Sequence, residues 1–208
     1  MEKEFVTFII PSLNRPTLVR SVESIINQTD SNWKIIIVFD GFYELIKIPK
    51  KYKSKIKMLQ TPHLGEAGFV RNIGLKEVDT SWVAFLDDDD AVESTYVAKL
   101  KEYIQSDPKL EVVYFSINWG NNITPLPNED VGMHNGFISF AVKMDLINRH
   151  NILFGAGPTL EDRKFFVECK NHGKCLITYD PQYLVFIRSW WKGSGLEQLQ
   201  IKELLKFL

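Results

Sequence analysis

The sequence predicts an α/β protein whose central, mostly parallel sheet is flanked by helices. Two short apolar runs, "FVTFII" at 5–10 and "WKIIIVFDG" at 33–41, are typical of parallel strands that are covered on both faces. Between them, "TLVRSVESIINQ" at 17–28 has the apolar spacing of a helix that packs on a sheet. Strands and helices alternate in this way over the first half of the chain. This alternation favours a parallel sheet.

The remaining elements follow from the same two patterns. In the first half we expect strands at 55–61 and 81–86, with a helix at 65–78 between them. In the less regular second half we expect helices at 95–106, 143–151, 160–173 and 196–208, and strands at 110–119, 133–142 and 174–180. Pro11 is expected to end the first strand. The length of 208 residues suits one large domain, 1–208.

Composition excludes several classes of protein. Lys and Arg number 25 against 26 Asp and Glu, so the net charge of −1 gives no reason to expect a nucleic-acid partner. No apolar run approaches the ~20 residues of a transmembrane helix, and the acidic N-terminus does not resemble a secretory signal. Cys169 and Cys175 lack zinc-site spacing and are interpreted as reduced thiols. We therefore expect a soluble, cytoplasmic protein.

Four consecutive aspartates, Asp87 to Asp90, follow the expected strand at 81–86 directly. In open parallel sheets, ligands bind outside the carboxyl ends of the strands, and Asp40 is expected at the same edge. A solvated acidic turn and a calcium loop are alternatives, but the spacing does not match an EF-hand. Removing several carboxylates from water at the end of a buried strand costs free energy unless a cation compensates their charge. The pattern favours a magnesium or manganese site that also holds a diphosphate.

Several blocks in order resemble family 2 GT-A glycosyltransferases. They are "VTFIIPSLNRPTLVRSVESIINQT", "WKIIIVFDG", "GEAGFVRNIGL", "WVAFLDDDD" and, further on, "LEDRKFF" at 160–166. Together they cover positions 5 to about 170. The resemblance implies a GT-A (Rossmann-like) fold and a nucleotide-sugar glycosyltransferase. A fainter likeness is to short glycosyltransferase domains of large algal DNA viruses.

The resemblance also implies roles for individual residues in donor binding. The residues implied in binding the nucleotide-sugar are Pro11, Ser12, Leu13, Arg15, Asp40, Arg71, Asp87 and Asp88. The first four would line the base pocket, and Asp40 would accept a hydrogen bond from the uracil N–H. Arg71 would lie near the nucleotide or its phosphates, and Asp88 would meet ribose or sugar hydroxyls. Residues 1–105 would then bind the nucleotide-sugar, and 106–208 the acceptor.

For catalysis, the resemblance implies Asp89 as the ligand of Mn²⁺ or Mg²⁺ and Asp162 as the catalytic base. The function expected is inverting transfer from a UDP-sugar, UDP-glucose first, to a hydroxyl of a glycan or glycoprotein. Taken without the resemblance, Glu161 and Asp162 read as the acidic first turn of a helix. The family more often has "VDDGS" where this chain has "VFDGF" at 38–42, and four aspartates leave the register of the Asp-x-Asp pair open by one residue.

Trp190, Trp191 and Lys192 precede "GSG" and suit a flap that closes over a sugar, or simply a turn packed on the core. Two other functions stay open. A nucleotidyltransferase should have a glycine-rich loop after the first strand, whereas "PSLNRP" contains no glycine. A non-catalytic nucleotide-sugar or carbohydrate-binding module would keep the ligand without needing Asp162.

Overall fold

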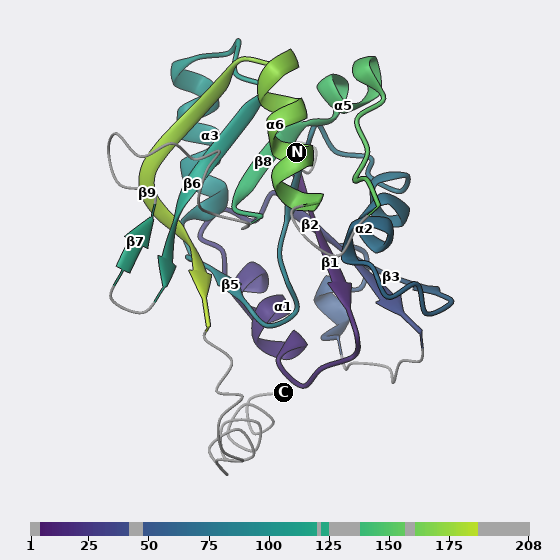
Figure 1. Cartoon of the computed structure of the whole chain (residues 1–208). Coiled ribbons are helices and arrows are strands. Elements are labelled where there is room, and N and C mark those ends of the chain that lie inside the picture. The colour runs from purple at the N-terminus through teal and green to yellow at the C-terminus, as the bar shows by residue number, and fades with distance from the viewer. Residues whose placement is uncertain (1–4, 42–47, 120–121, 125–137, 157–160, 187–208) are drawn as a thin grey trace.

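A computed structural model of the chain describes residues 5–41, 48–119, 122–124, 138–156 and 161–186 (Figure 1). The strands are β1 (Val6–Ser12), β2 (Trp33–Asp40), β3 (Ile56–Thr61), β4 (Trp82–Phe85), β5 (Ala91–Val92), β6 (Val112–Trp119), β7 (Asn122–Thr124), β8 (Phe140–Lys143) and β9 (Cys175–Val185). The helices are α1 (Leu18–Ile26), η1 (Lys50–Tyr52), α2 (Ala67–Leu75), α3 (Tyr96–Ser106), α5 (Met144–His150) and α6 (Glu161–His172).

All the described strands belong to one sheet, in the order β3-β2-β1-β4-β8-β6-β9-β5, with β7 paired to β6. The first four run parallel to one another, as the strand–helix alternation predicts. Beyond β4 the sheet is mixed, because β8 pairs antiparallel with both β4 and β6, whereas β6 and β9 are parallel. The predicted α/β class with helices around a central sheet is confirmed (Figure 1).

The side chains of β2 show how the helices cover both faces of the sheet. Ile36 and Val38 pack with Val70 of α2, whereas Ile35 and Ile37 belong to the large core that includes Leu18, Val22 and Ile25 of α1. Successive residues of a strand point to opposite faces. The helices α1 and α2 therefore cover opposite faces of the parallel half, which explains why these strands are apolar without alternation.

The end of β1 differs from the sequence prediction, because Pro11 lies within the strand. The carbonyl of Ile9 accepts a hydrogen bond from the Leu86 N–H, on the side of β1 that faces β4. Backbone groups two residues apart in a strand point to the same side, so the nitrogen of Pro11 also faces the β4 side. The pairing of β1 with β4 ends at Ile9 and Phe85, while pairing with β2 continues through Ser12. The proline therefore has no ladder bond to break, and β1 extends toward the site.

Other boundaries also differ. The helix α2 is shorter than the expected 65–78, and β9 runs on to Val185, beyond the expected end at 180. The expected strand at 133–142 is described only from 138, and Phe140–Lys143 is its strand part. The short strands β5 and β7 were not expected. The helix expected at 196–208 lies outside the described residues.

Candidate active site

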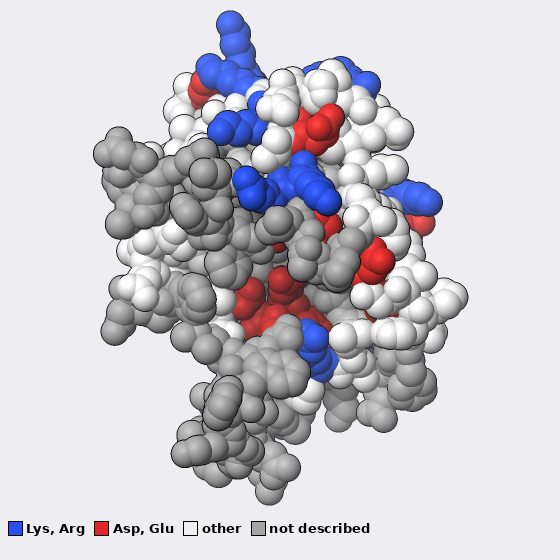
Figure 2. All heavy atoms as spheres, viewed as in Figure 1, with Lys and Arg blue, Asp and Glu red and all other residues white. Residues whose placement is uncertain are grey.

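The four aspartates leave the sheet at the carboxyl end of β4 and form a turn, in which the Asp90 N–H donates to the Asp87 carbonyl (3.2 Å). Ser21 of α1 supports this turn, since its hydroxyl donates to the carbonyls of Asp87 (3.2 Å) and Asp90 (2.7 Å). Arg20 donates to the carbonyl of Asp89. The start of α1 thus holds the backbone of the turn. On the surface, acidic side chains gather in a hollow (Figure 2).

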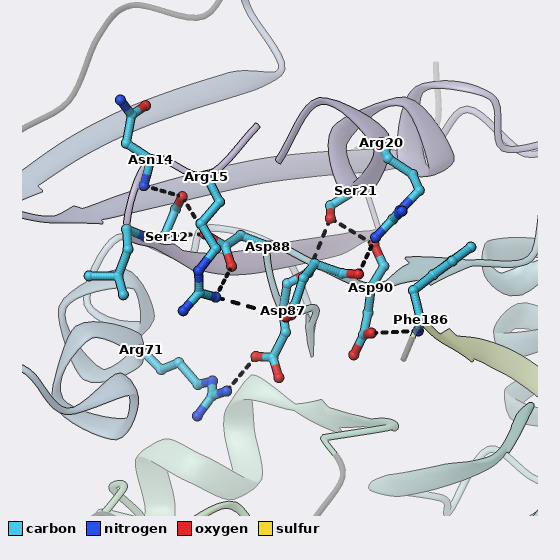
Figure 3. A network of polar contacts seen from close by, with 12 residues as sticks. Ser12, Asn14, Arg15, Arg20, Ser21, Arg71, Asp87, Asp88, Asp90 and Phe186 are labelled. Carbon is cyan, nitrogen blue, oxygen red and sulfur yellow. Dashed lines mark hydrogen bonds and ion pairs between the residues drawn. The ribbon is translucent and has the colours of Figure 1, made fainter. Parts of the chain in front are cut away.

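The aspartate side chains divide into two groups. Asp88 turns toward the end of β1, where it accepts hydrogen bonds from the Ser12 hydroxyl (2.8 Å) and the Leu13 N–H (3.2 Å) and pairs with Arg15 (2.8 Å; Figure 3). Asp87, Asp89 and Asp90 instead each offer one carboxylate oxygen, and these oxygens all lie within 4.8 Å of one another. We call these three residues the aspartate cluster.

The electrostatics of the aspartate cluster fit a bound divalent cation. Burial and, to a smaller extent, the charge of Asp87 raise the pKa of Asp90 to about 7. Burial also raises the pKa of Asp88, despite its hydrogen bond from Ser12 and the charge of Arg15. Burial therefore disfavours the charged forms of both carboxylates. Three convergent carboxylate oxygens are the ligands that Mg²⁺ and similar ions prefer.

The end of β9 closes the other side of the aspartate cluster. The hydroxyl of Tyr183 accepts a hydrogen bond from the Asp87 N–H (3.2 Å) and donates to the Asp90 carboxylate (3.1 Å). The Phe186 N–H donates to the second oxygen of Asp90 (3.1 Å), and the Arg20 guanidinium lies 3.8 Å from the centre of the Phe186 ring. Strands from both halves of the chain therefore position Asp90.

Asp162 lies in the first turn of α6 and is buried, with its carboxylate accepting a hydrogen bond from the Arg163 N–H (2.7 Å). Burial raises its pKa, and the neighbouring charge of Glu161 adds to this effect. Tyr114 of β6 lies nearby: burial raises the pKa of its phenol, and so does the charge of Asp162. The Tyr114 hydroxyl has no hydrogen-bond partner in the part of the chain that the structure describes.

Arg71 connects the two acidic groups. Its guanidinium pairs with Asp87 (2.6 Å) and with Glu161 (3.3 Å), and its side chain is only 4% exposed. Burial lowers the pKa of Arg71, but the charges of Asp87 and Glu161 outweigh burial and hold it above its ordinary value. Arg71 therefore bridges the aspartate cluster and the Glu161–Asp162 pair, through Asp87 on one side and Glu161 on the other.

Asp40 ends β2 at the same edge of the sheet. Its carboxylate accepts hydrogen bonds from the backbone N–H groups of Leu64 and Gly65 (2.9 Å for Gly65), and His63 Nδ1 lies 3.4 Å from it. Gly65 has φ +73°, a conformation that glycine adopts readily. Asp40 thus holds the loop between β3 and α2 close to the end of β2.

The structure brings together most of the residues that the sequence singled out. Ser12, Leu13 and Arg15 surround Asp88, and Arg71 joins Asp87 to the start of α6. Asp40 lies at the same sheet edge but contacts the loop after β3 rather than these groups. Trp190, Trp191 and Lys192, the residues of the suggested flap, lie outside the described residues.

Sequence reasoning did not find Ser21, Tyr114 or Tyr183. Ser21 carried a usable signal, because it is a polar residue at helical spacing between Leu18 and Ile25 on the apolar face of α1. Tyr114 looked like an ordinary strand residue, and Tyr183 lay beyond the expected end of the last strand. Their contacts with the site depend on how the second half of the chain joins the sheet.

Known proteins resemble this chain in sequence. The family model described as "Glycosyl transferase family 2" matches residues 7–160. The poly(ribitol-phosphate) beta-N-acetylglucosaminyltransferase TarP of Staphylococcus aureus is 25% identical over 213 residues, which cover 92% of this chain and 65% of TarP.

Two solved structures share the fold. S. aureus TarS 1–349 in complex with UDP superposes with a TM-score of 0.76 at 16% identity, over 98% of this chain and 64% of that one. The mannosyltransferase PcManGT of Pyrobaculum calidifontis, in complex with GDP-Man and Mn²⁺, superposes with a TM-score of 0.66 at 14% identity, over 99% of this chain and 63% of that one. The chain spans less than two thirds of each of these three relatives.

Proposed function

The chain belongs to glycosyl transferase family 2, and we propose that it is a metal-dependent inverting hexosyltransferase that moves a sugar from a UDP-sugar to an acceptor hydroxyl. The acceptor class that we propose is a glycan or glycoprotein. One observation carries the proposal: Arg71 joins the carboxylate cluster at the carboxyl edge of the parallel strands to Glu161, the residue next to the buried Asp162 on α6. One site could thus hold a metal ion with the donor's diphosphate and, close to them, the base that the reaction needs.

The donor is proposed to lie along the ends of β1 and β2. Pro11, Ser12, Leu13 and Arg15 would line the base pocket, with Asp40 facing the uracil N–H and Asp88 the ribose or sugar hydroxyls. The contacts of Asp88 with Ser12 and Arg15 support a preformed pocket wall. UDP-glucose is the donor expected from the sequence. UDP-GlcNAc is the second donor to test, since TarS also forms a complex with it.

A divalent cation, Mn²⁺ or Mg²⁺, would be held by Asp89 together with Asp87 and Asp90. When bound, such an ion neutralises negative charge on the departing diphosphate. The convergence of the three carboxylate oxygens supports this assignment, and PcManGT is a relative of the same fold in complex with Mn²⁺. Arg71 would orient Asp87 through their short contact.

Asp162 is proposed as the base. Its carboxylate would accept the proton of the acceptor hydroxyl while that oxygen attacks the anomeric carbon and the bond from this carbon to the diphosphate breaks. One displacement at one carbon inverts its configuration. Burial, which raises the pKa of Asp162, supports the role because a carboxylate at its ordinary pKa is a weak base.

The chain is proposed to act as one domain, with residues 1–105 binding the nucleotide-sugar and 106–208 the acceptor. Asp162 on α6 belongs to the second part, which places the proposed base on the acceptor side. Trp190, Trp191 and Lys192 would close over the sugar. Their place in the chain after β9, whose end contacts Asp90, supports this assignment.

The test combines donor binding with turnover. Melting temperature is measured with UDP, UDP-glucose, UDP-GlcNAc, GDP, dTDP, CMP and ATP, each with and without Mn²⁺. A ligand at ~100 times its Kd should add about 2.7 kcal/mol to the free energy of unfolding. We expect a shift with UDP and its sugars that requires Mn²⁺ and is lost in Asp89→Asn.

Turnover separates the enzyme from the alternatives. In Asp162→Asn we expect transfer to fall by about 10²- to 10⁴-fold while UDP still stabilises the protein. Stabilisation by UDP-sugars without transfer to any acceptor tested would favour the binding module. Stabilisation only by a nucleoside triphosphate would favour a nucleotidyltransferase. Absence of any metal-dependent shift would contradict the proposal.

A further inference from the structure

One face of α2 lies against both acidic parts of the site. Arg71 and Asn72 lie three and four residues after Gly68, so both are neighbours of Gly68 on the helix surface. Gly68 and Arg71 are buried, whereas the apolar Phe69 is 36% exposed. The inner face of this helix therefore includes polar and small residues that need an explanation.

Gly68 allows α2 to approach the start of α6 closely. A Cβ at this position would lie 3.0 Å from Cγ of Glu161 and 3.0 Å from Cβ of Phe154. Such contacts are tighter than most Cβ contacts in proteins, so Glu161 and Phe154 would have to move by a few tenths of an ångström. Glycine in a helix interior is unfavourable relative to alanine, so its use here is consistent with a requirement for this close approach.

Asn72 holds the segment that leads toward α6. Its Nδ2 donates to the Phe154 carbonyl (2.8 Å), and its Oδ1 accepts from the Phe154 N–H (2.9 Å). The Phe154 ring stacks on Phe165 of α6, with centroids 4.0 Å apart and planes 6° from parallel. Phe165 lies three residues after Asp162, on the adjoining turn of the same helix. The position of Phe154 therefore affects the position of Asp162.

Arg71 completes the connection by contacting both ends. It joins Asp87 to Glu161 and lies over the Phe154 ring, 5.5 Å from its centroid. A buried arginine between two carboxylates is weak evidence for stability, because apolar residues of similar volume often stabilise a protein as well. The Arg71 guanidinium instead fixes the distance between Asp87 and Glu161, the two carboxylates that it joins.

We propose that Gly68, Arg71 and Asn72 are positioning residues that set the placement of Asp162 relative to the aspartate cluster. This inference rests on the proposed function, because it assigns these residues to the geometry between the leaving group and the base. Gly68 and Asn72 are not proposed to touch the donor or the reacting atoms, so their effect should appear in kcat and leave donor binding intact. Arg71 also contacts Asp87 of the aspartate cluster, so its loss would change donor binding as well.

The first test compares two glycine substitutions. Gly68→Ala adds the Cβ that would press on Glu161 and Phe154, whereas Gly155→Ala adds a Cβ with no atom within 4 Å. Displacement of a reacting group by less than an ångström lowers rates strongly, so we expect kcat of Gly68→Ala to fall by about 10- to 100-fold. Its donor KM and its Kd for UDP with Mn²⁺ should stay within about twofold of wild type. Gly155→Ala should match wild type in all three.

A second variant covers the case in which Gly68→Ala does not fold. Asn72→Ala removes both hydrogen bonds to Phe154, and the same selective loss of kcat is expected. Equal kcat in Gly68→Ala, Asn72→Ala and Gly155→Ala would overturn the inference, as would parallel losses of kcat and UDP binding. A wild-type protein that transfers no sugar would instead remove the proposed function, and the inference with it.

Discussion

At the scale of single residues, adjacent aspartates have different tasks because their environments differ. Asp88 and Asp90 are both buried, but Asp88 is stabilised as an anion by Arg15 and by two hydrogen bonds. Asp90 has hydrogen bonds from Tyr183 and Phe186 and faces the charge of Asp87. Of these two aspartates, Asp90 is accordingly the one whose charge is less compensated without a bound cation.

The metal-free protein should therefore lose stability as the pH rises. The pKa of Asp90 is about 7 in the folded state and near 3.8 in the unfolded chain. Between these values the folded state binds more protons, so the free energy of unfolding decreases with rising pH. We expect a decrease on the order of a few kcal/mol between about pH 4 and pH 7, measured by urea unfolding.

Substitution of Asp90 tests whether this residue causes the pH dependence of the free energy of unfolding. Asp90→Asn should flatten this dependence and raise stability at pH 7. Asp145→Asn is the control, because Asp145 is exposed and pairs with Arg149 on the surface of α5. If Asp90→Asn and wild type show the same slope, the assignment to Asp90 is wrong.

At the scale of elements, β9 is the part of the second half that most directly shapes the aspartate cluster. It pairs with β6 over most of its length and with β5, the two-residue strand that directly follows Asp90. This double pairing brings the Tyr183 hydroxyl between the Asp87 backbone and the Asp90 side chain. A single buried hydroxyl thus ties together the two ends of the four-aspartate turn.

Removal of that hydroxyl should weaken the fold and the metal site together. Tyr183→Phe leaves a buried N–H and a buried carboxylate oxygen with one partner fewer. We expect the free energy of unfolding to fall by about 1–3 kcal/mol, measured by denaturant titration, and Mn²⁺ to bind more weakly. Tyr179→Phe is the matched control on the same strand, since Tyr179 is 51% exposed. Equal stabilities of the two variants would contradict this role of Tyr183.

At the scale of the whole molecule, the described parts of both halves form one sheet around one main core. The strand β8, from the second half, pairs with β4 of the first half. Phe85 of β4 contacts the rings of Phe140, Phe154 and Phe165, which all come from the second half. The proposed donor half therefore depends on the acceptor half for much of its core.

A fragment of residues 1–105 should consequently not fold by itself. It would expose the unpaired edge of β4 and the ring of Phe85 to water. We expect no cooperative thermal transition in circular dichroism and no stabilisation by UDP with Mn²⁺, in contrast to the whole chain. A fragment that melts cooperatively and binds UDP would show instead that the donor half is a separate domain.

Local pattern was sufficient for most elements and for the location of the site. Apolar runs and helical spacing depend on neighbouring residues, and the strand–helix alternation led to the parallel order β3-β2-β1-β4. Element ends were less predictable. Pro11 continues β1 only because the adjoining ladder with β4 has already ended, and that depends on a strand more than seventy residues away.

The sequence by itself determined that aspartates would gather at the carboxyl end of a buried strand, because both features lie in one continuous segment. Only the tertiary structure decided which carboxylates converge, since Ser12, Ser21 and Tyr183 orient them from distant elements. It also decided that Arg71 joins Asp87 to Glu161, a connection across ninety residues of chain. The direction of a side chain depends on packing between distant elements, so it cannot be predicted from the pattern of neighbouring residues.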